Sequence, residues 1–272
     1  MFGTQLRQFI RGHRRSSVLK ALASASEKYL RAFHNEGFYV FDSNGERFAA
    51  TTLARWAGDK PLLIWDVGAH LGGWSEVAHE IFPKASITSF EILPPIAEKL
   101  AARRSAETWF KLEQIGFSDR VGEVEVTWNT KHDTTNSIEP RLGNEFFQDA
   151  DLVRIPCRVS TIDTYLSEGA PPPDFLKIDV EGHELPVLKG ARGLFSGSHA
   201  PVMIQFEYGD TWLPGSHTLQ SAQAYLEAFG YTVGRLYPDH VAFKSYSYPD
   251  DNFRMGNMIA VRDDSLKALL AG

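Results

Sequence analysis

The positions of apolar residues in this chain of 272 residues alternate between two patterns from residue 61 onward. Near-continuous apolar runs, typical of buried strands, occur at residues 62–67, 86–91, 109–115, 175–180 and 202–206. Apolar residues at helical spacing occur at residues 74–82, 96–104, 184–195 and 219–229. Buried strands that alternate with helices predict an α/β fold with a mostly parallel sheet and helices on both faces.

Three other segments follow different patterns. Strict alternation at 123–128 and 153–159 predicts an inserted antiparallel pair at 120–160, with a polar loop, 129–150, that carries Thr134, Thr135, Asn136 and Ser137. Near the start, the turn Asp42-Ser43-Asn44-Gly45 lies between Phe38–Phe41 and Arg47-Phe48 and predicts a β-hairpin. The end of the chain (231–237, 241–243 and 258–261) predicts further antiparallel strands.

Composition excludes several classes of protein. With 43% apolar and 12% aromatic residues the chain can bury a core, which excludes wholesale disorder. The single Cys157 excludes a disulfide framework and a cysteine-based zinc site. Apolar runs shorter than a membrane span and a net charge of −6 predict a soluble, cytoplasmic protein that does not coat nucleic acid.

The charge is unevenly distributed along the chain. Residues 1–35 carry seven lysines and arginines against the single acid Glu27, a net +6, which leaves −12 for the rest. Apolar residues at helical spacing predict a basic, amphipathic helical extension over 1–35, followed by one α/β domain over 36–272. Three interpretations of the extension stay open: a helix peripheral to an anionic membrane, a dimer contact, or a capping helix with a solvated basic face.

A glycine-containing turn follows the first predicted strand. It reads Asp66-Val67-Gly68-Ala69-His70-Leu71-Gly72-Gly73. Dinucleotide sites have G-x-G-x-x-G, whose middle glycine approaches a pyrophosphate, and here His70 takes that position. The turn therefore suits an adenosine-containing ligand without a pyrophosphate. Glu91, which ends the second strand, is placed to accept hydrogen bonds from both ribose hydroxyls.

A second group of polar residues follows the apolar strand at 175–178. Asp179, Glu181, His183 and Glu184 lie within six residues, and Glu207 ends a later strand. Open α/β sheets bind ligands at this edge. His183 is a candidate general base, metal ligand or solvated helix-start residue, whereas the acid of Glu184 has a simpler explanation as a partner of the helix dipole.

These motifs resemble the FkbM family of S-adenosylmethionine-dependent methyltransferases. The matching segments are Asp66–Gly72, Phe90-Glu91, Gly116–Asp119 with Gly122, and Lys177–Glu184 with Leu188–Ala191. The resemblance implies a Rossmann-like class I methyltransferase fold, with a seven-stranded sheet whose last strand is antiparallel. It also implies that Asp66, Gly68 and Gly72 line the methionine end of the cofactor, with Glu91 on the ribose and with Phe117, Ser118 and Asp119 beside the adenine. His70 stands where the family commonly has Asn, so we assign it to the cofactor site without a side-chain role.

The resemblance further implies O-methylation of a hydroxyl on a sugar, a glycan or another small metabolite. We expect His183 or Asp179 to act as the base or to orient it, and Asn136, Ser137, Glu181 and Glu207 to contact the acceptor. A divalent metal held by Asp179 and Glu207 is an alternative way to activate the hydroxyl. Two other functional classes stay open: a nicotinamide-dependent oxidoreductase and a non-catalytic binding protein.

Overall fold

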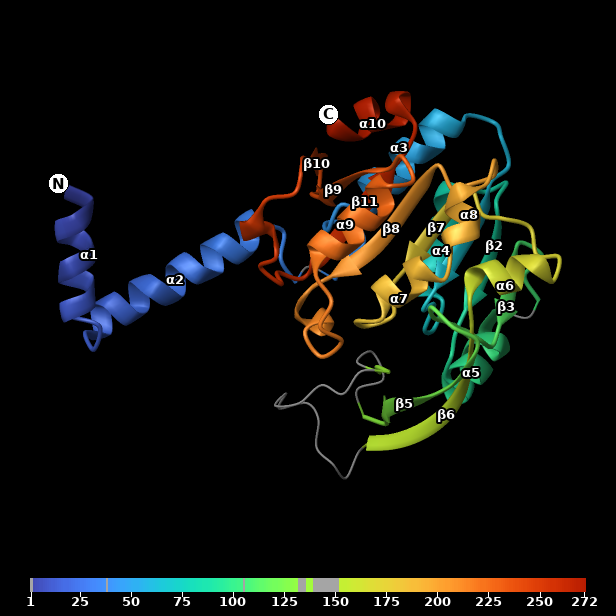
Figure 1. Ribbon diagram of the computed structural model, residues 1–272, viewed down its shortest axis with the longest axis horizontal. Helices are drawn as coiled ribbons and strands as arrows, with labels where there is room; N and C mark the ends of the chain where they lie inside the picture. Colours follow the sequence, from blue (N-terminus) through green and yellow to red (C-terminus); the bar gives the residue numbers. More distant parts are fainter. Residues whose placement is uncertain (1, 38, 105, 132–135, 139–151) are drawn as a thin grey trace.

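An eight-stranded mixed sheet forms the centre of the protein in the computed structural model, which describes residues 2–37, 39–104, 106–131, 136–138 and 152–272 (Figure 1). The strand order is β10-β9-β11-β8-β7-β1-β2-β3. The strands span Leu63–Val67 (β1), Ser86–Phe90 (β2), Phe110–Glu113 (β3), Phe175–Ile178 (β7), Met203–Tyr208 (β8), Thr232–Leu236 (β9), Val241–Phe243 (β10) and Gly256–Val261 (β11).

The strand directions confirm the predicted class I sheet. β3, β2, β1, β7 and β8 run parallel, and β11, the last strand in the chain, lies antiparallel between β8 and β9. The predicted count of seven strands is one short, because β10 pairs with β9 and extends the edge of the sheet. The carboxyl ends of β1, β2 and β7 therefore meet at one edge.

Helices cover both faces of this sheet. Successive side chains of a strand point to opposite faces of the sheet. Ile64 therefore packs with α3, α4 and α10, whereas Trp65 and Val67 pack with α6, α7, α8 and α9. The helices of the body span Glu46–Ala57 (α3), Gly73–Ile81 (α4), Pro94–Arg104 (α5), Ile162–Ser167 (α6), Glu184–Lys189 (α7), Arg192–Ser196 (α8), Leu219–Glu227 (α9) and Asp264–Ala271 (α10). The single helix predicted over 184–195 is thus two short helices, α7 and α8.

A second, three-stranded sheet branches from the body beyond α5 (Figure 1). β5 (Gly122–Asn129) and β6 (Leu152–Ser160) pair antiparallel along their whole length, as the alternation predicted, and β4 (Gly116–Phe117) pairs parallel with β6. Thr134, Thr135 and most of the polar loop predicted over 129–150 lie outside the described residues.

The predicted hairpin near residue 43 is wrong. Residues 46–57 form the helix α3, and residues 41–45 form the turn that leads into it. Gly45 has φ +100°, and a Cβ there would lie 2.3 Å from the carbonyl oxygen of Tyr237. The Asn-Gly pair thus provides a left-handed turn in front of a helix rather than between two strands. Phe38 lies outside the described residues.

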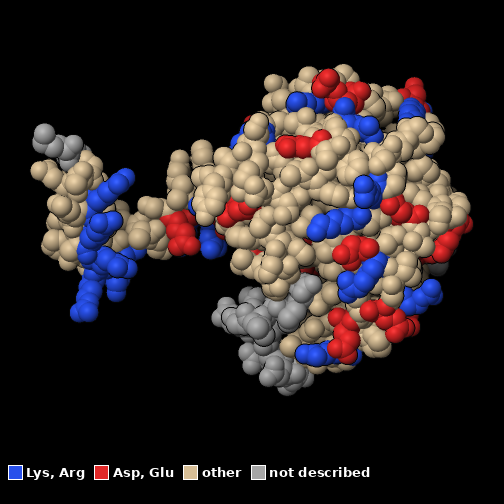
Figure 2. All heavy atoms as spheres, in the orientation of Figure 1, with Lys and Arg blue, Asp and Glu red and all other residues tan. Residues whose placement is uncertain are grey.

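The N-terminal segment forms an arm of two helices that extends from the body (Figures 1 and 2). α1 (Phe2–Gly12) and α2 (Ser17–Phe33) replace the single helical segment predicted over 1–35. None of the residues of α2 is buried. In the described part of the chain no helix has the length and apolarity needed to cross a membrane.

Candidate active site

A cavity of about 720 Å³ opens at the carboxyl ends of β1, β2 and β7. It is lined by nine of the residues that the sequence singled out: Gly68, His70, Glu91, Phe117, Asn136, Ser137, Asp179, Glu181 and Glu207. The tertiary structure therefore brings four of the eight predicted cofactor residues and all four predicted acceptor residues into one space.

The glycine turn after β1 is held close to the turn after β7. Gly68 has φ +85°, and a Cβ there would lie 1.8 Å from the carbonyl oxygen of Asp179. The amides of Gly68 and Ala69 both donate to the carbonyl oxygen of Phe90, each at 3.0 Å. Only glycine permits this approach, which leaves the floor of the cavity as bare backbone. Gly72, with φ +76°, immediately precedes α4, and a Cβ there would lie 2.6 Å from the Leu100 side chain.

Glu91 is held rigidly at the wall of the cavity. One carboxylate oxygen accepts from the amide of His70 and the other from the amide of Leu93, both at 2.9 Å. Burial raises the pKa of Glu91 to about 7, although these amides oppose the rise. Each oxygen keeps a lone pair for another donor, so the geometry fits the two hydroxyls of a ribose.

Asp66 lies beneath the cavity and does not line it. Its side chain is fully buried, accepts from the hydroxyl of Ser75 at 2.7 Å and lies 3.1 Å from the ammonium of Lys177. That ammonium also lies 3.4 Å from Asp179. This geometry makes Asp66 a support for the glycine turn and for the Lys177 ammonium. A direct contact with the cofactor stays a prediction.

A buried polar group that the sequence pattern did not reveal also lines the cavity. Glu46, at the start of α3, accepts from Gln205 and from Asn44, both at 2.6 Å. Asn44 and Glu46 line the cavity together with Tyr39 and Asn257. In a hairpin over residues 38–48, Glu46 would lie at the surface, and the one sequence signal for this group is an acid just after an Asn-Gly turn.

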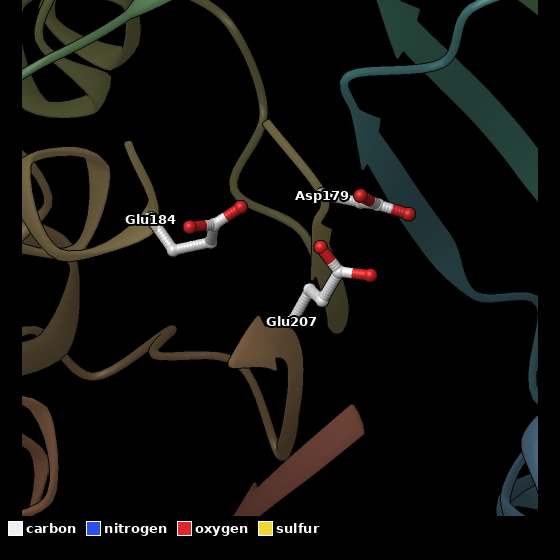
Figure 3. A group of neighbouring side chains, drawn as sticks. All are labelled: Asp179, Glu184 and Glu207. Carbon is white, nitrogen blue, oxygen red and sulfur yellow. The ribbon is translucent and has the colours of Figure 1, made fainter. Parts of the chain in front are cut away.

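Three carboxylates converge beside the cavity (Figure 3). Asp179, Glu184 and Glu207 each offer an oxygen within 4.8 Å of the other two. Glu184 is fully buried and accepts from the amides of Val180 and Gly182. Burial raises its pKa to about 8 against the effect of those amides. Glu184 thus shapes the turn that carries Glu181 (φ +58°) and Gly182 (φ +107°).

This cluster has the ligand chemistry of a divalent-cation site, and it also has partners within the chain. The Lys177 ammonium lies beside Asp179, and backbone amides satisfy Glu184. Both reduce the repulsion between the carboxylates. The predicted metal on Asp179 and Glu207 therefore stays an alternative, which removal of metal can test.

His183 does not line the cavity. Its side chain is buried, and its Nε2 lies 2.9 Å from the hydroxyl of Ser118, so both residues pack behind the wall. Burial lowers the pKa of His183 to about 4, with a further contribution from His217. Asp119 is half-exposed and accepts from Ser118. The base role of His183 and the adenine contacts of Ser118 and Asp119 stay predictions, and this placement favours Asp179 over His183 as the base.

Asn136 and Ser137 connect the inserted sheet to the cavity. The hydroxyl of Ser137 donates to the carbonyl oxygen of Glu181 at 2.9 Å, and the side-chain oxygen of Asn136 accepts from the amide of Asn129. Both residues line the cavity, while these bonds hold the segment in place. Their contact with an acceptor stays a prediction.

Phe117 lines the same cavity from β4. Its ring lies against Phe90 and Trp65, with centroid separations of 4.7 and 6.1 Å. This aromatic wall stands beside Glu91, which suits an adenine next to a ribose.

Comparison with protein families supports this interpretation of the geometry. The profile of the family described as "Methyltransferase FkbM domain" matches residues 66–233, which runs from the glycine turn to β9. The chain belongs to the FkbM methyltransferase family. An FkbM protein is an S-adenosylmethionine-dependent methyltransferase, so S-adenosylmethionine is the cofactor, and the nicotinamide alternative is set aside.

This FkbM chain shares limited sequence identity with the following relatives. It is 26% identical over 201 residues to "Methyltransferase sdnD" of Sordaria araneosa, covering 64% of this chain and 75% of the relative. Among solved structures, it is similar to precorrin-6y C5,15-methyltransferase of Geobacter metallireducens (14% identity, TM-score 0.41, 79% and 87% of the two chains). It is also similar to the fibrillarin pre-rRNA processing protein of Methanococcus jannaschii (12% identity, TM-score 0.44, 82% and 76%).

Proposed function

We propose that the protein transfers the methyl group of S-adenosylmethionine to a hydroxyl oxygen of an uncharged sugar, a glycan or another hydroxylated small metabolite. The observation that carries this proposal is the continuity of the cavity. It runs from Gly68 and Glu91, which fit the cofactor, to Asp179 and Glu207, where carboxylates face an acceptor.

The charge of the lining supports an uncharged acceptor. The described residues that line the cavity include the carboxylates Glu46, Glu91, Asp179, Glu181 and Glu207 and no lysine or arginine. Carboxylates accept hydrogen bonds from several sugar hydroxyls at once, whereas they repel phosphates and uronates. This lining therefore favours a neutral polyhydroxyl compound.

Asp179 is the residue best placed to accept the proton of the acceptor. S-adenosylmethionine supplies an electrophilic methyl group, and the new carbon–oxygen bond forms as the carbon–sulfur bond breaks and its electron pair goes to sulfur. An alkyl hydroxyl is a weak nucleophile, so losing its proton to a carboxylate during attack lowers the barrier. The Asp179 side chain is 38% exposed, lines the cavity, and is oriented by the Lys177 ammonium.

Lys177 supports a metal-independent transfer. Its ammonium supplies a fixed positive charge beside Asp179, the position where a divalent cation would otherwise be needed. We therefore expect turnover to be equal in EDTA and in Mg²⁺. A loss of turnover in EDTA that Mg²⁺ restores would favour the metal alternative on Asp179 and Glu207.

The test measures transfer of labelled methyl from S-adenosylmethionine to a panel of neutral sugars, uronates, sugar phosphates and amines. We expect label on a neutral hydroxyl compound. Asp179→Asn should lower kcat on the order of 100-fold or more and leave the affinity for S-adenosylhomocysteine within a few-fold. Asp210→Asn, a matched change at an exposed acid outside the cavity, should leave both unchanged.

Three outcomes would contradict parts of this proposal. Label only on amines would exclude O-methylation, and normal turnover of the Asp179 variant would exclude that residue as the base. Binding of cofactor without transfer to any compound of the panel would favour the non-catalytic alternative.

A further inference from the structure

The N-terminal arm presents an apolar stripe to solvent on each of its two helices. On α1, Leu6, Phe9 and Ile10 are 43–54% exposed, and the helical advance of about 100° per residue places them on one face. On α2, Val18, Leu22, Tyr29 and Phe33 form a second stripe, each more than half exposed. Large side chains in such a row are costly to leave in water, so the stripe indicates a surface that is covered in use.

The charge beside the stripe has one sign. Arg7, Arg11, Arg14 and Arg15 gather along α1 and the bend that follows it, where Figure 2 shows lysine and arginine as one patch. On α2, Lys20 and Arg31 lie across the helix from Val18 and Leu22. Lys28 flanks the stripe, and Glu27 is the single acid of the arm. The body shows both signs interspersed on the same view (Figure 2).

We propose that α1 and α2 lie in the headgroup region of an anionic lipid bilayer, with the apolar stripe inserted and the basic side chains against lipid phosphates. A helix with an apolar face and a basic polar face binds in this way, because apolar burial and attraction to anionic lipid act together. No described helix can cross a membrane, so the arm lies along the surface.

The charge pattern argues against a second copy of this chain as the cover. Two arms that pack stripe to stripe would bring two sets of seven basic residues together, with Glu27 as the single compensating acid on each. Paired helices usually carry both signs beside the seam, so that charges complement across it. An anionic lipid surface complements the basic flank directly.

The arm is attached firmly to the body, so docking would hold the whole protein at the surface. The side-chain amide of Asn35 donates to the carbonyl oxygens of Asn44 and Leu236. The guanidinium of Arg235 donates to the carbonyl oxygen of His34. Asn44 also lines the cavity. Lipid binding would thus place the root of the arm, and the cavity beside it, at a fixed distance from the membrane.

The test is co-sedimentation of the full chain with two kinds of vesicle. One is phosphatidylcholine alone, and the other contains about 30% phosphatidylglycerol, which makes it anionic. We expect binding to the anionic vesicles, which salt weakens, and at least tenfold weaker binding to the neutral ones. Leu6→Ser with Phe9→Ser, and separately Arg7→Gln with Arg11→Gln, should each weaken anionic binding on the order of tenfold.

Matched controls remove the same chemistry from the body. Val121→Ser with Leu213→Ser removes two exposed apolar side chains, and Arg154→Gln with Arg158→Gln removes two exposed charges. Both should bind like the natural chain. Equal binding to both vesicle types, or binding to neither, would overturn the proposal. In the second case, a dimer in sedimentation velocity that Leu6→Ser with Phe9→Ser dissociates would identify a second copy as the cover.

Discussion

The ammonium of Lys177 lies 3.1 Å from the carboxylate of Asp66, and the two side chains are 5% and 0% exposed. Burial by itself would lower the pKa of Lys177, but the carboxylates of Asp66 and Asp179 outweigh it, so the pKa is raised and the lysine stays charged. This pair joins β1 to β7 directly below the glycine turn. The position of the cofactor turn therefore depends on a buried charge pair.

Replacing Lys177 by Met should destabilise the protein strongly. The change leaves the Asp66 carboxylate buried without its cation, which costs about 3–5 kcal/mol in the free energy of unfolding. Urea denaturation measures the free energy of unfolding of the variant and of the natural chain. The control is Lys60→Met, which breaks an ion pair with Asp174 in which the lysine is 59% exposed and should cost less than about 1 kcal/mol. Equal losses in the two variants would mean that the buried pair is not a special support.

Replacing Gly68 by Ala should disrupt the cavity floor. An added Cβ would lie 1.8 Å from the carbonyl oxygen of Asp179, so one of the two turns must move, at a cost of roughly 3 kcal/mol. The displaced turn should also lower the affinity for S-adenosylhomocysteine, which calorimetry measures. Gly73→Ala is the matched control, since its Cβ meets nothing within 4 Å at the start of α4, and it should keep both stability and affinity. An unaltered affinity in Gly68→Ala would show that the turn is not part of the cofactor site.

Replacing Glu91 by Gln should weaken cofactor binding on the order of tenfold or more, because hydrogen bonds to a charged acceptor contribute about 1.5–3 kcal/mol. Because the pKa of Glu91 is about 7, the affinity for the cofactor should also depend on pH. The ionised form accepts from both ribose hydroxyls, so the affinity of the natural chain should rise between pH 6 and pH 8. That rise should be absent in Glu91→Gln and present in Glu123→Gln, an exposed control. A pH-independent affinity in the natural chain would contradict the ribose role.

Glu184 should make the protein less stable as the pH rises. Its pKa is about 8 in the folded protein and near 4.5 when unfolded, so between pH 5 and pH 8 the folded state holds a proton that the unfolded state has lost. The free energy of unfolding then falls by up to about 1.4 kcal/mol per pH unit and levels off above pH 8. Denaturation curves of Glu184→Gln should show a smaller slope, and those of the exposed Glu98→Gln should keep the original slope. An identical slope in the Glu184 variant would mean that other groups carry the pH dependence.

The local features of the fold could be predicted because they depend on neighbouring residues. The apolar runs of β1, β2, β7 and β8, the helical spacing of α4, α5 and α9, and the alternation of β5 and β6 all lie within short windows. The same holds for the glycine turn and for the acids after β7. The hairpin predicted over residues 38–48 was wrong because an Asn-Gly turn is also compatible with the start of a helix. The close approach of Gly45 to Tyr237 decides in favour of the helix.

By itself, the sequence determined the alternating strands and helices of the central sheet, the glycine turn, and the acids at strand ends, because hydrophobic period and turn chemistry act over a few residues. Only the tertiary structure decided that Asp179 faces the cavity, that Asp66 lies beneath it against Lys177, and that His183 packs against Ser118. It also decided that Glu46 meets Gln205, 159 residues away. These outcomes depend on which buried polar group meets which partner. Burial makes an unpaired charge so costly that a distant part of the chain must supply its partner.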